Sequence, residues 1–217
     1  MAICVIIGGK LPSIAYQTVN GSASAATSYT FTSQPIGTAD SSRYVIVSAM
    51  LSMAGSSGAM LGCTIGGTAG TNISGATHTF VTGAADICFG MWRRNVTSGT
   101  TANIVVTSTV SAANCHIGVW SIYDTRDAGA PFASTFGSTT GATLNLNVNT
   151  DTNGVGCGLV LNAANVTWTG ATEDYDALIA GKWMSGASFS GAAAATPRSV
   201  SLTSGTSSHY GNFASFR

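Results

Sequence analysis

Charged residues are scarce in this chain of 217 residues, at 7% of the sequence, against roughly a quarter in typical soluble domains. Eight basic and eight acidic residues cancel to a net charge of zero. A nucleic-acid-binding surface shows as a cluster of basic side chains, and only Arg93 and Arg94 come close to one. That pair suits a solvated strand end, so we expect no nucleic acid among the partners. Weak repulsion between copies favours association instead.

Long apolar runs are also missing. No stretch reaches the roughly 18 apolar residues that a membrane-spanning helix requires, so the sequence predicts no membrane span. The first residues, MAICVIIGGK, form a short apolar run with no basic residue ahead of it, whereas a secretory signal needs a charged flank and a small-residue cleavage site. We interpret residues 1–20 as an N-terminal arm or first strand that the mature protein keeps.

Closely spaced cysteine pairs are absent, and with them the short ligand spacings on which zinc sites depend. Buried free thiols that pack as small hydrophobic groups are the first interpretation of the dispersed cysteines. Disulfides within the chain or between subunits are the alternative, and an odd number of cysteines leaves at least one unpaired within the chain. The five are Cys4, Cys63, Cys88, Cys115 and Cys157.

The chain carries no GxSxG, HExxH or P-loop motif, and its histidines, His78, His116 and His209, are far apart. The densest acidic stretch, TEDYDAL, contains Glu173, Asp174 and Asp176. These carboxylates are weak candidates for calcium binding or glycoside hydrolysis, because the other residues of a calcium loop are missing. A solvated loop is the simpler interpretation. We expect no cofactor and no enzymatic activity, because few titratable groups are available for a tuned acid pair.

Short strand signals recur along the whole chain, separated by clusters of glycine, serine and asparagine. In TLNLNVNT, Leu144, Leu146 and Val148 alternate with asparagines, which indicates a half-buried strand. RYVIVSAM is apolar on both faces and predicts a central strand. This pattern predicts an all-β fold, an antiparallel β-sandwich of jelly-roll type. We expect residues 21–217 to form a single sandwich domain with an internal connection near residues 124–131.

The stretch PIGTADSSRYVIVSAM joins a polar turn to that central strand. Asp40 can cap its own turn by accepting hydrogen bonds from backbone N–H groups two residues on, and Arg43 can reach Asp40 or a neighbouring carbonyl. We expect Asp40 and Arg43 to form a structural turn that fixes the strand register.

Four tryptophans could stack against sugar rings, although large aromatic residues of a sandwich more often fill its core. Trp168 and Trp183 lie near glycine-rich and acidic stretches, so they are the candidate sugar contacts.

Four segments carry a resemblance to a known group of proteins: SYTFTSQPIGTADSSRYVIVSAM, TIGGTAGTNIS, MWRRNVTSGTTANIVVTSTVS and CHIGVWSIY. They resemble β-sandwich proteins of tailed bacteriophages and prophages, in which an IGxAxxxR turn precedes a central strand, an IGG turn follows, and SGTTA opens a later hairpin. The resemblance covers roughly residues 27–123. It implies a non-enzymatic virion component, such as a decoration, collar, head-spike or tail-fibre protein, and brings no catalytic residue with it.

Two functions therefore stand side by side. The first is a structural subunit located in the virion, whose partners are copies of itself and other virion proteins. In this interpretation MAICVIIGGKL could add a strand to a neighbour's sheet edge, and Cys4 could cross-link subunits. The alternative is a carbohydrate-binding module on a virion appendage, which would recognise a host surface glycan.

Overall fold

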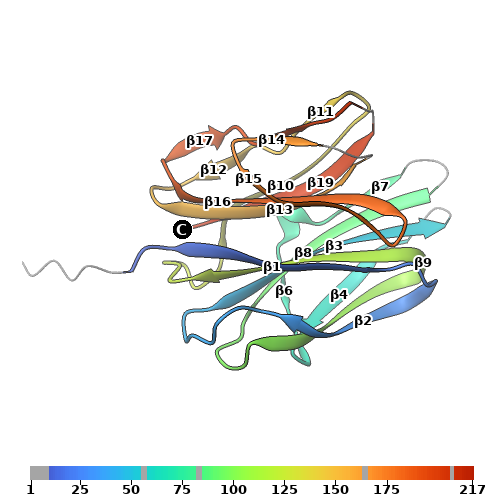
Figure 1. The fold of residues 1–217 in the computed structure, drawn as a ribbon, viewed down its shortest axis with the longest axis horizontal. Coiled ribbons are helices and arrows are strands. Elements are labelled where there is room, and N and C mark those ends of the chain that lie inside the picture. Colours follow the sequence, from blue (N-terminus) through green and yellow to red (C-terminus); the bar gives the residue numbers. More distant parts are fainter. Residues whose placement is uncertain (1–9, 55–57, 82–84, 163–165, 206–207) are drawn as a thin grey trace, which may run out of the picture.

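A computed structural model describes residues 10–54, 58–81, 85–162, 166–205 and 208–217. Over these residues the chain forms strands, one 3₁₀ helix (η1, Ser74–Ala76) and no α-helix. Every strand pairing recorded between them is antiparallel (Figure 1). The expectation of an all-β antiparallel sandwich is confirmed. No helix of the described residues is long and apolar enough to span a membrane.

The N-terminal half of the chain forms a nine-stranded sheet, sheet A, in the order β5-β4-β9-β3-β8-β6. Strands β1 and β2 pair with β9, and β7 pairs with β8. The strands are β1 (Ser13–Ser22), β2 (Ala26–Pro35), β3 (Tyr44–Ala54), β4 (Met60–Ile65), β5 (Thr68–Ala69), β6 (Thr71–Asn72), β7 (His78–Val81), β8 (Ala85–Asn95) and β9 (Thr101–Tyr123).

Strand β9 folds sheet A back on itself, because its two halves belong to different layers (Figure 1). Its first half pairs with β2 and β4, and its second half pairs with β1 and β3. Ala112 marks the change of layer, since the pairings of β9 with both β2 and β3 are irregular next to it. The first core lies between these two layers and includes Phe31 and Ile104 from one layer and Val47 and Ile117 from the other.

The C-terminal half forms the remaining three sheets. Sheet B has five strands in the order β10-β19-β13-β16-β15, sheet C has the order β11-β18-β14, and sheet D is the pair β12-β17. The strands are β10 (Pro131–Thr139), β11 (Thr143–Asn145), β12 (Val148–Thr150), β13 (Gly154–Asn162), β14 (Thr167–Thr169), β15 (Thr172–Ile179), β16 (Lys182–Ala192), β17 (Ala195–Arg198), β18 (Ser201–Thr203) and β19 (His209–Phe216).

Two further cores bring the fold to four layers. The second core joins the β1/β9/β3/β8 layer to sheet B, through side chains such as Phe89 and Leu159. The third core lies between sheet B and the short strands of sheets C and D, which cover it with Leu144, Leu202 and Val148 (Figure 1). The alternation expected in TLNLNVNT is confirmed, because its three apolar side chains are buried and its asparagines are exposed.

The chain passes from sheet A to sheet B through residues 124–130, which link β9 to β10. Across the second core, Asn212 accepts a hydrogen bond from the Ser48 hydroxyl at 2.8 Å and donates one to the Ala76 carbonyl at 2.8 Å. This satisfied polar pair sits between the halves, where an unpaired buried amide would be costly. Within the segment interpreted as an arm or first strand, residues 13–20 belong to β1, and residues 1–9 lie outside the described residues.

Candidate functional sites

Asp40 and Arg43 lie in the turn that leads into β3. The Asp40 carboxylate accepts hydrogen bonds from the Ser42 backbone N–H and hydroxyl, both at 2.7 Å. These two bonds lower the pKa of Asp40, the backbone bond most strongly. The turn therefore has the geometry expected of an aspartate that bonds two residues ahead.

Arg43 is fully buried and reaches carbonyl oxygens. Its guanidinium donates to Val96 at 2.7 Å, to Gly37 at 2.6 Å, and to Ser98 and Gly99 at 2.9 Å each. One side chain thus holds the start of β3 against the loop between β8 and β9. Carbonyl dipoles compensate the buried charge, which points to a structural role.

The cysteines Cys63, Cys88, Cys115 and Cys157 are free and buried. Burial raises the pKa of each of these four thiols, for Cys63 to about 12. Such thiols are inert and cannot reach a neighbouring subunit. The disulfide alternative is therefore wrong for these four, which pack as small hydrophobic groups, and Cys4 lies outside the described residues.

The prediction that Trp168 contacts a sugar is wrong, because its ring is not accessible to a ligand. It is buried in the third core, 6.3 Å from the Phe213 ring between centroids, and its indole N–H donates to the Ser185 hydroxyl at 2.7 Å. Its ring is covered because sheet C packs over sheet B. Trp183 is half-buried on β16, paired with Leu178 of β15, so neither residue presents a fully open ring to a ligand.

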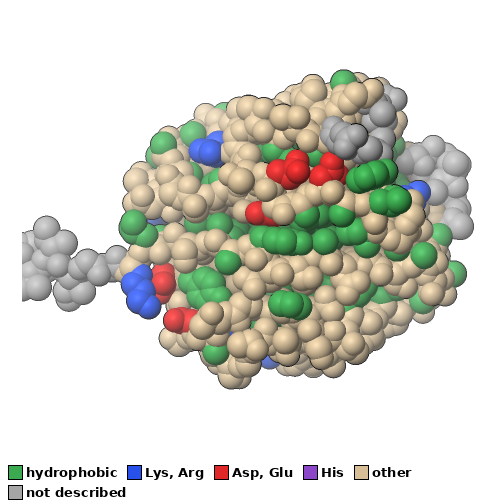
Figure 2. All heavy atoms as spheres, in the orientation of Figure 1, with side chains coloured by type: hydrophobic (Ala, Val, Ile, Leu, Met, Phe, Trp, Pro, Cys, Tyr) green, Lys and Arg blue, Asp and Glu red, His purple; other side chains and the backbone are tan. Residues whose placement is uncertain are grey.

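The acidic residues lie on β15 and not in the expected solvated loop. Asp174 accepts from the Trp120 indole N–H at 2.7 Å and from the Ser188 hydroxyl at 2.9 Å, while Asp176 accepts from the Val166 backbone N–H at 3.1 Å. Figure 2 shows acidic side chains gathered over this edge of sheet B. No group of three or more His, Cys, Asp or Glu side chains in the described residues is arranged to hold a metal ion.

Burial raises the pKa of Asp174, and that of Glu173 is raised by burial first and by the neighbouring Asp176 second. An aromatic cluster adjoins Asp174. In it the Tyr16 ring lies 5.2 Å from Tyr175 and 6.1 Å from Trp120. Asp174 therefore lies where β15 approaches Tyr16 of β1.

His116 was expected to be a polar residue on a sheet face or in a loop, but the structure places its imidazole in the core. His116, on β9, is fully buried, and neither ring nitrogen has a hydrogen-bond partner among the described protein atoms. It lies against Gly21, where a Cβ would stand 2.8 Å from its Nδ1 atom. Burial first and Lys182 second lower its pKa to about 4. The neutral ring therefore behaves as a core side chain at neutral pH.

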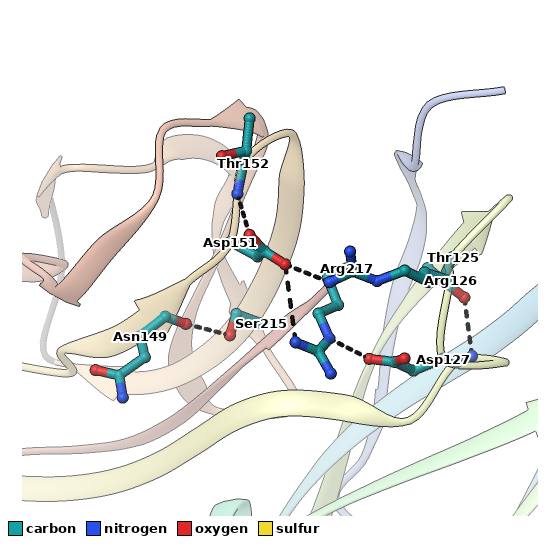
Figure 3. Close-up of polar contacts among 9 residues, drawn as sticks. Thr125, Arg126, Asp127, Asn149, Asp151, Thr152, Ser215 and Arg217 are labelled. Atoms are coloured by element: carbon teal, nitrogen blue, oxygen red, sulfur yellow. Dashed lines mark hydrogen bonds and ion pairs between the residues drawn. The ribbon is translucent and has the colours of Figure 1, made fainter. Parts of the chain in front are cut away.

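A mixed-charge cluster forms where the two halves of the chain meet. Arg126 pairs with Asp151, and Arg217 pairs with Asp127 and lies 3.8 Å from Asp151 (Figure 3). A cavity of about 260 Å³ adjoins it, lined also by Lys10. Both carboxylates are already paired with arginines. The cluster therefore joins the β9–β10 connection to Arg217, the residue that follows β19.

Comparison with known proteins does not assign this chain to a family. No family model and no curated protein matches the chain. Among solved structures, an anti-sigma factor domain-containing protein from Clostridium clariflavum is 9% identical over 85% of this chain and 77% of that chain, with a TM-score of 0.23. Another anti-sigma factor domain-containing protein is 8% identical over 87% and 74%, also with a TM-score of 0.23. Scores this low carry no argument about fold or function.

Proposed function

We propose that this protein is a non-enzymatic structural subunit of a tailed-phage particle, and that it assembles with a second copy through the β10 edge of sheet B. Two features of the sequence support the proposal: the resemblance over residues 27–123 and the very low charge content. The first concerns the kind of protein, and the second concerns its tendency to associate.

The observation that carries the proposal is the difference between the two edges of sheet B. Strand β15 forms one edge and carries Glu173, Asp174 and Asp176, and charged side chains on an edge discourage pairing with another chain. Strand β10 forms the other edge and contains no charged residue in its sequence PFASTFGST. An uncharged edge is a template for a further strand.

Aromatic side chains border this edge. Phe136 of β10 is 41% exposed and stacks on His78 of β7, with ring centroids 3.9 Å apart and planes at 4°. Phe132 of β10 and Val81 of β7 are also exposed. Burying exposed apolar area is the main favourable contribution to association, and Phe136 lies within the segment whose backbone groups would pair.

Among the described residues, the C-terminal half of β10 pairs with no strand other than β19, and one face of its Gly137 packs against residues 144–146. The 3₁₀ helix η1 lies against Ser134, because a Cβ on Gly75 would stand 2.3 Å from the Ser134 hydroxyl oxygen. Residues 135–139 extend beyond this contact. Antiparallel pairing of this segment with the same segment of a second copy would join two five-stranded sheets around a two-fold axis.

Light scattering after size exclusion tests the proposal, with reductant present throughout so that Cys4 cannot cross-link copies. The unmodified chain is expected to give a defined oligomer, and Phe136→Ser is expected to shift the mass toward the monomer. Leu178→Ser is the matched control, because Leu178 is 60% exposed but lies on the acidic β15 edge. A monomeric parent chain, or an oligomer unchanged by Phe136→Ser, would refute the proposal.

A further inference from the structure

The outermost layer of sheet A carries a cavity of about 560 Å³. Its floor is the start of β9, where Thr101, Asn103 and Val105 face outward while the residues between them face the first core. Thr30 of β2 lies beside Val105, because these two residues are partners in the antiparallel pairing of β2 with β9. Outward side chains on one strand are about 7 Å apart, so the floor presents the polar groups of Thr30, Thr101 and Asn103 around the apolar Val105.

Asn103 ties together the two rims of this cavity. Its side-chain oxygen accepts a hydrogen bond from the Ser33 backbone N–H at 2.9 Å, and its backbone carbonyl accepts one from the Gly66 N–H at 2.8 Å. Ser33 has a φ of 51°, in a bulge of β2. The opposite rim is the Gly66-Gly67 turn, and a Cβ on Gly67 would meet no atom within 4 Å. That rim is therefore open to an incoming molecule.

The lining decides which chemistry can bind. None of the described residues that line the cavity is ionisable or aromatic. Arg94 borders the cavity at Gly66, where its guanidinium donates to the carbonyls of Ile65 and Gly66. Among the lining residues a charged ligand would find no counter-ion, and an apolar ligand would find only Val105 and Ala102. Hydroxyl and amide groups can each donate and accept hydrogen bonds, which suits a ligand rich in hydroxyl groups.

We infer that this cavity binds an uncharged, polyhydroxylated ligand, a neutral saccharide, by hydrogen bonds from Thr30, Thr101 and Asn103. The volume lies within the range of small-molecule sites, about 300–1,000 Å³. Several copies displayed on one assembly would gain by avidity. The inference does not depend on assembly through β10, which lies on another sheet.

Saturation-transfer NMR on the full chain tests this inference with three neutral probes: maltotriose, cellotriose and tri-N-acetylchitotriose. At least one is expected to bind saturably. Thr30→Val and Thr101→Val keep the side-chain shape and remove one hydroxyl each, so each is expected to weaken that binding about three- to tenfold, as loss of one hydrogen bond predicts.

Thr167→Val is the matched control, because Thr167 is an exposed strand threonine on sheet C, away from the cavity. It is expected to bind as the parent chain does. Thermal unfolding of all variants shows whether the fold is intact. The inference is overturned if none of the three saccharides binds, or if both cavity variants bind like Thr167→Val.

Discussion

Protonation of His116 is expected to destabilise the fold as the pH falls. The buried ring has a pKa of about 4 in the folded chain, against about 6.5 in an unfolded one. Below about pH 6.5 the unfolded state therefore binds a proton that the folded state rejects, so the free energy of unfolding decreases until about pH 4 and then levels off. One proton is worth about 1.4 kcal/mol per pH unit, which gives a loss of about 2 kcal/mol between pH 7 and pH 4.5.

Urea denaturation of the parent chain and of His116→Gln, at both pH values, measures this effect. The variant cannot titrate at this position and should lose about 2 kcal/mol less than the parent. Met50→Leu is the matched control, because Met50 is buried and pairs with His116 across β3 and β9, so this variant should keep the parent's pH dependence. The raised pKa values of Glu173 and Asp174 act in the opposite direction, favouring the fold as pH falls, but they are common to all three proteins. Equal pH dependence in His116→Gln and the parent would refute the reasoning.

Two further predictions concern buried polar contacts. Arg43→Lys keeps the charge but not the planar guanidinium that donates to four carbonyls. It should lower the free energy of unfolding by about 2–4 kcal/mol. A loss under about 0.5 kcal/mol in urea denaturation would contradict a structural role for these four hydrogen bonds. Asp174→Ala leaves the Trp120 indole N–H without its acceptor and should lower the free energy of unfolding by about 1–3 kcal/mol. Asp174→Asn should lower it less, because its amide oxygen can still accept this hydrogen bond. Equal losses of unfolding free energy in the two variants, measured by urea denaturation, would count against a stabilising role for this hydrogen bond.

Local patterns predicted much of the strand chemistry. RYVIVSAM was expected to be covered on both faces, and its residues from Val45 to Met50 are all buried, facing the first and second cores in turn. The short polar turn before it has the expected bond from Ser42 to Asp40. Both features are set by residues close together in sequence, through side-chain period and turn geometry.

The layering could not be predicted in the same way. TANIVVTSTV and CHIGVWSIY give two separate strand signals, because the residues between them are small and polar, yet β9 continues through them from Thr101 to Tyr123. Whether such a segment turns or merely bends depends on partners distant in sequence, here Ala26 and Met53, which both pair with Ala112. The burial of Trp168 could not be predicted for a similar reason, since it lies on sheet C, which is formed by short strands from three parts of the chain and packs on sheet B.

Amide hydrogen exchange followed by mass spectrometry, on dilute and concentrated solutions of the full chain, tests the central claim most directly. If copies pair through β10, the backbone amides of residues 135–139 should exchange more slowly in the concentrated sample, while those of β15 at the acidic edge should exchange equally in both. Exchange in residues 135–139 that is independent of concentration, in a sample shown by light scattering to be oligomeric, would contradict assembly through this edge.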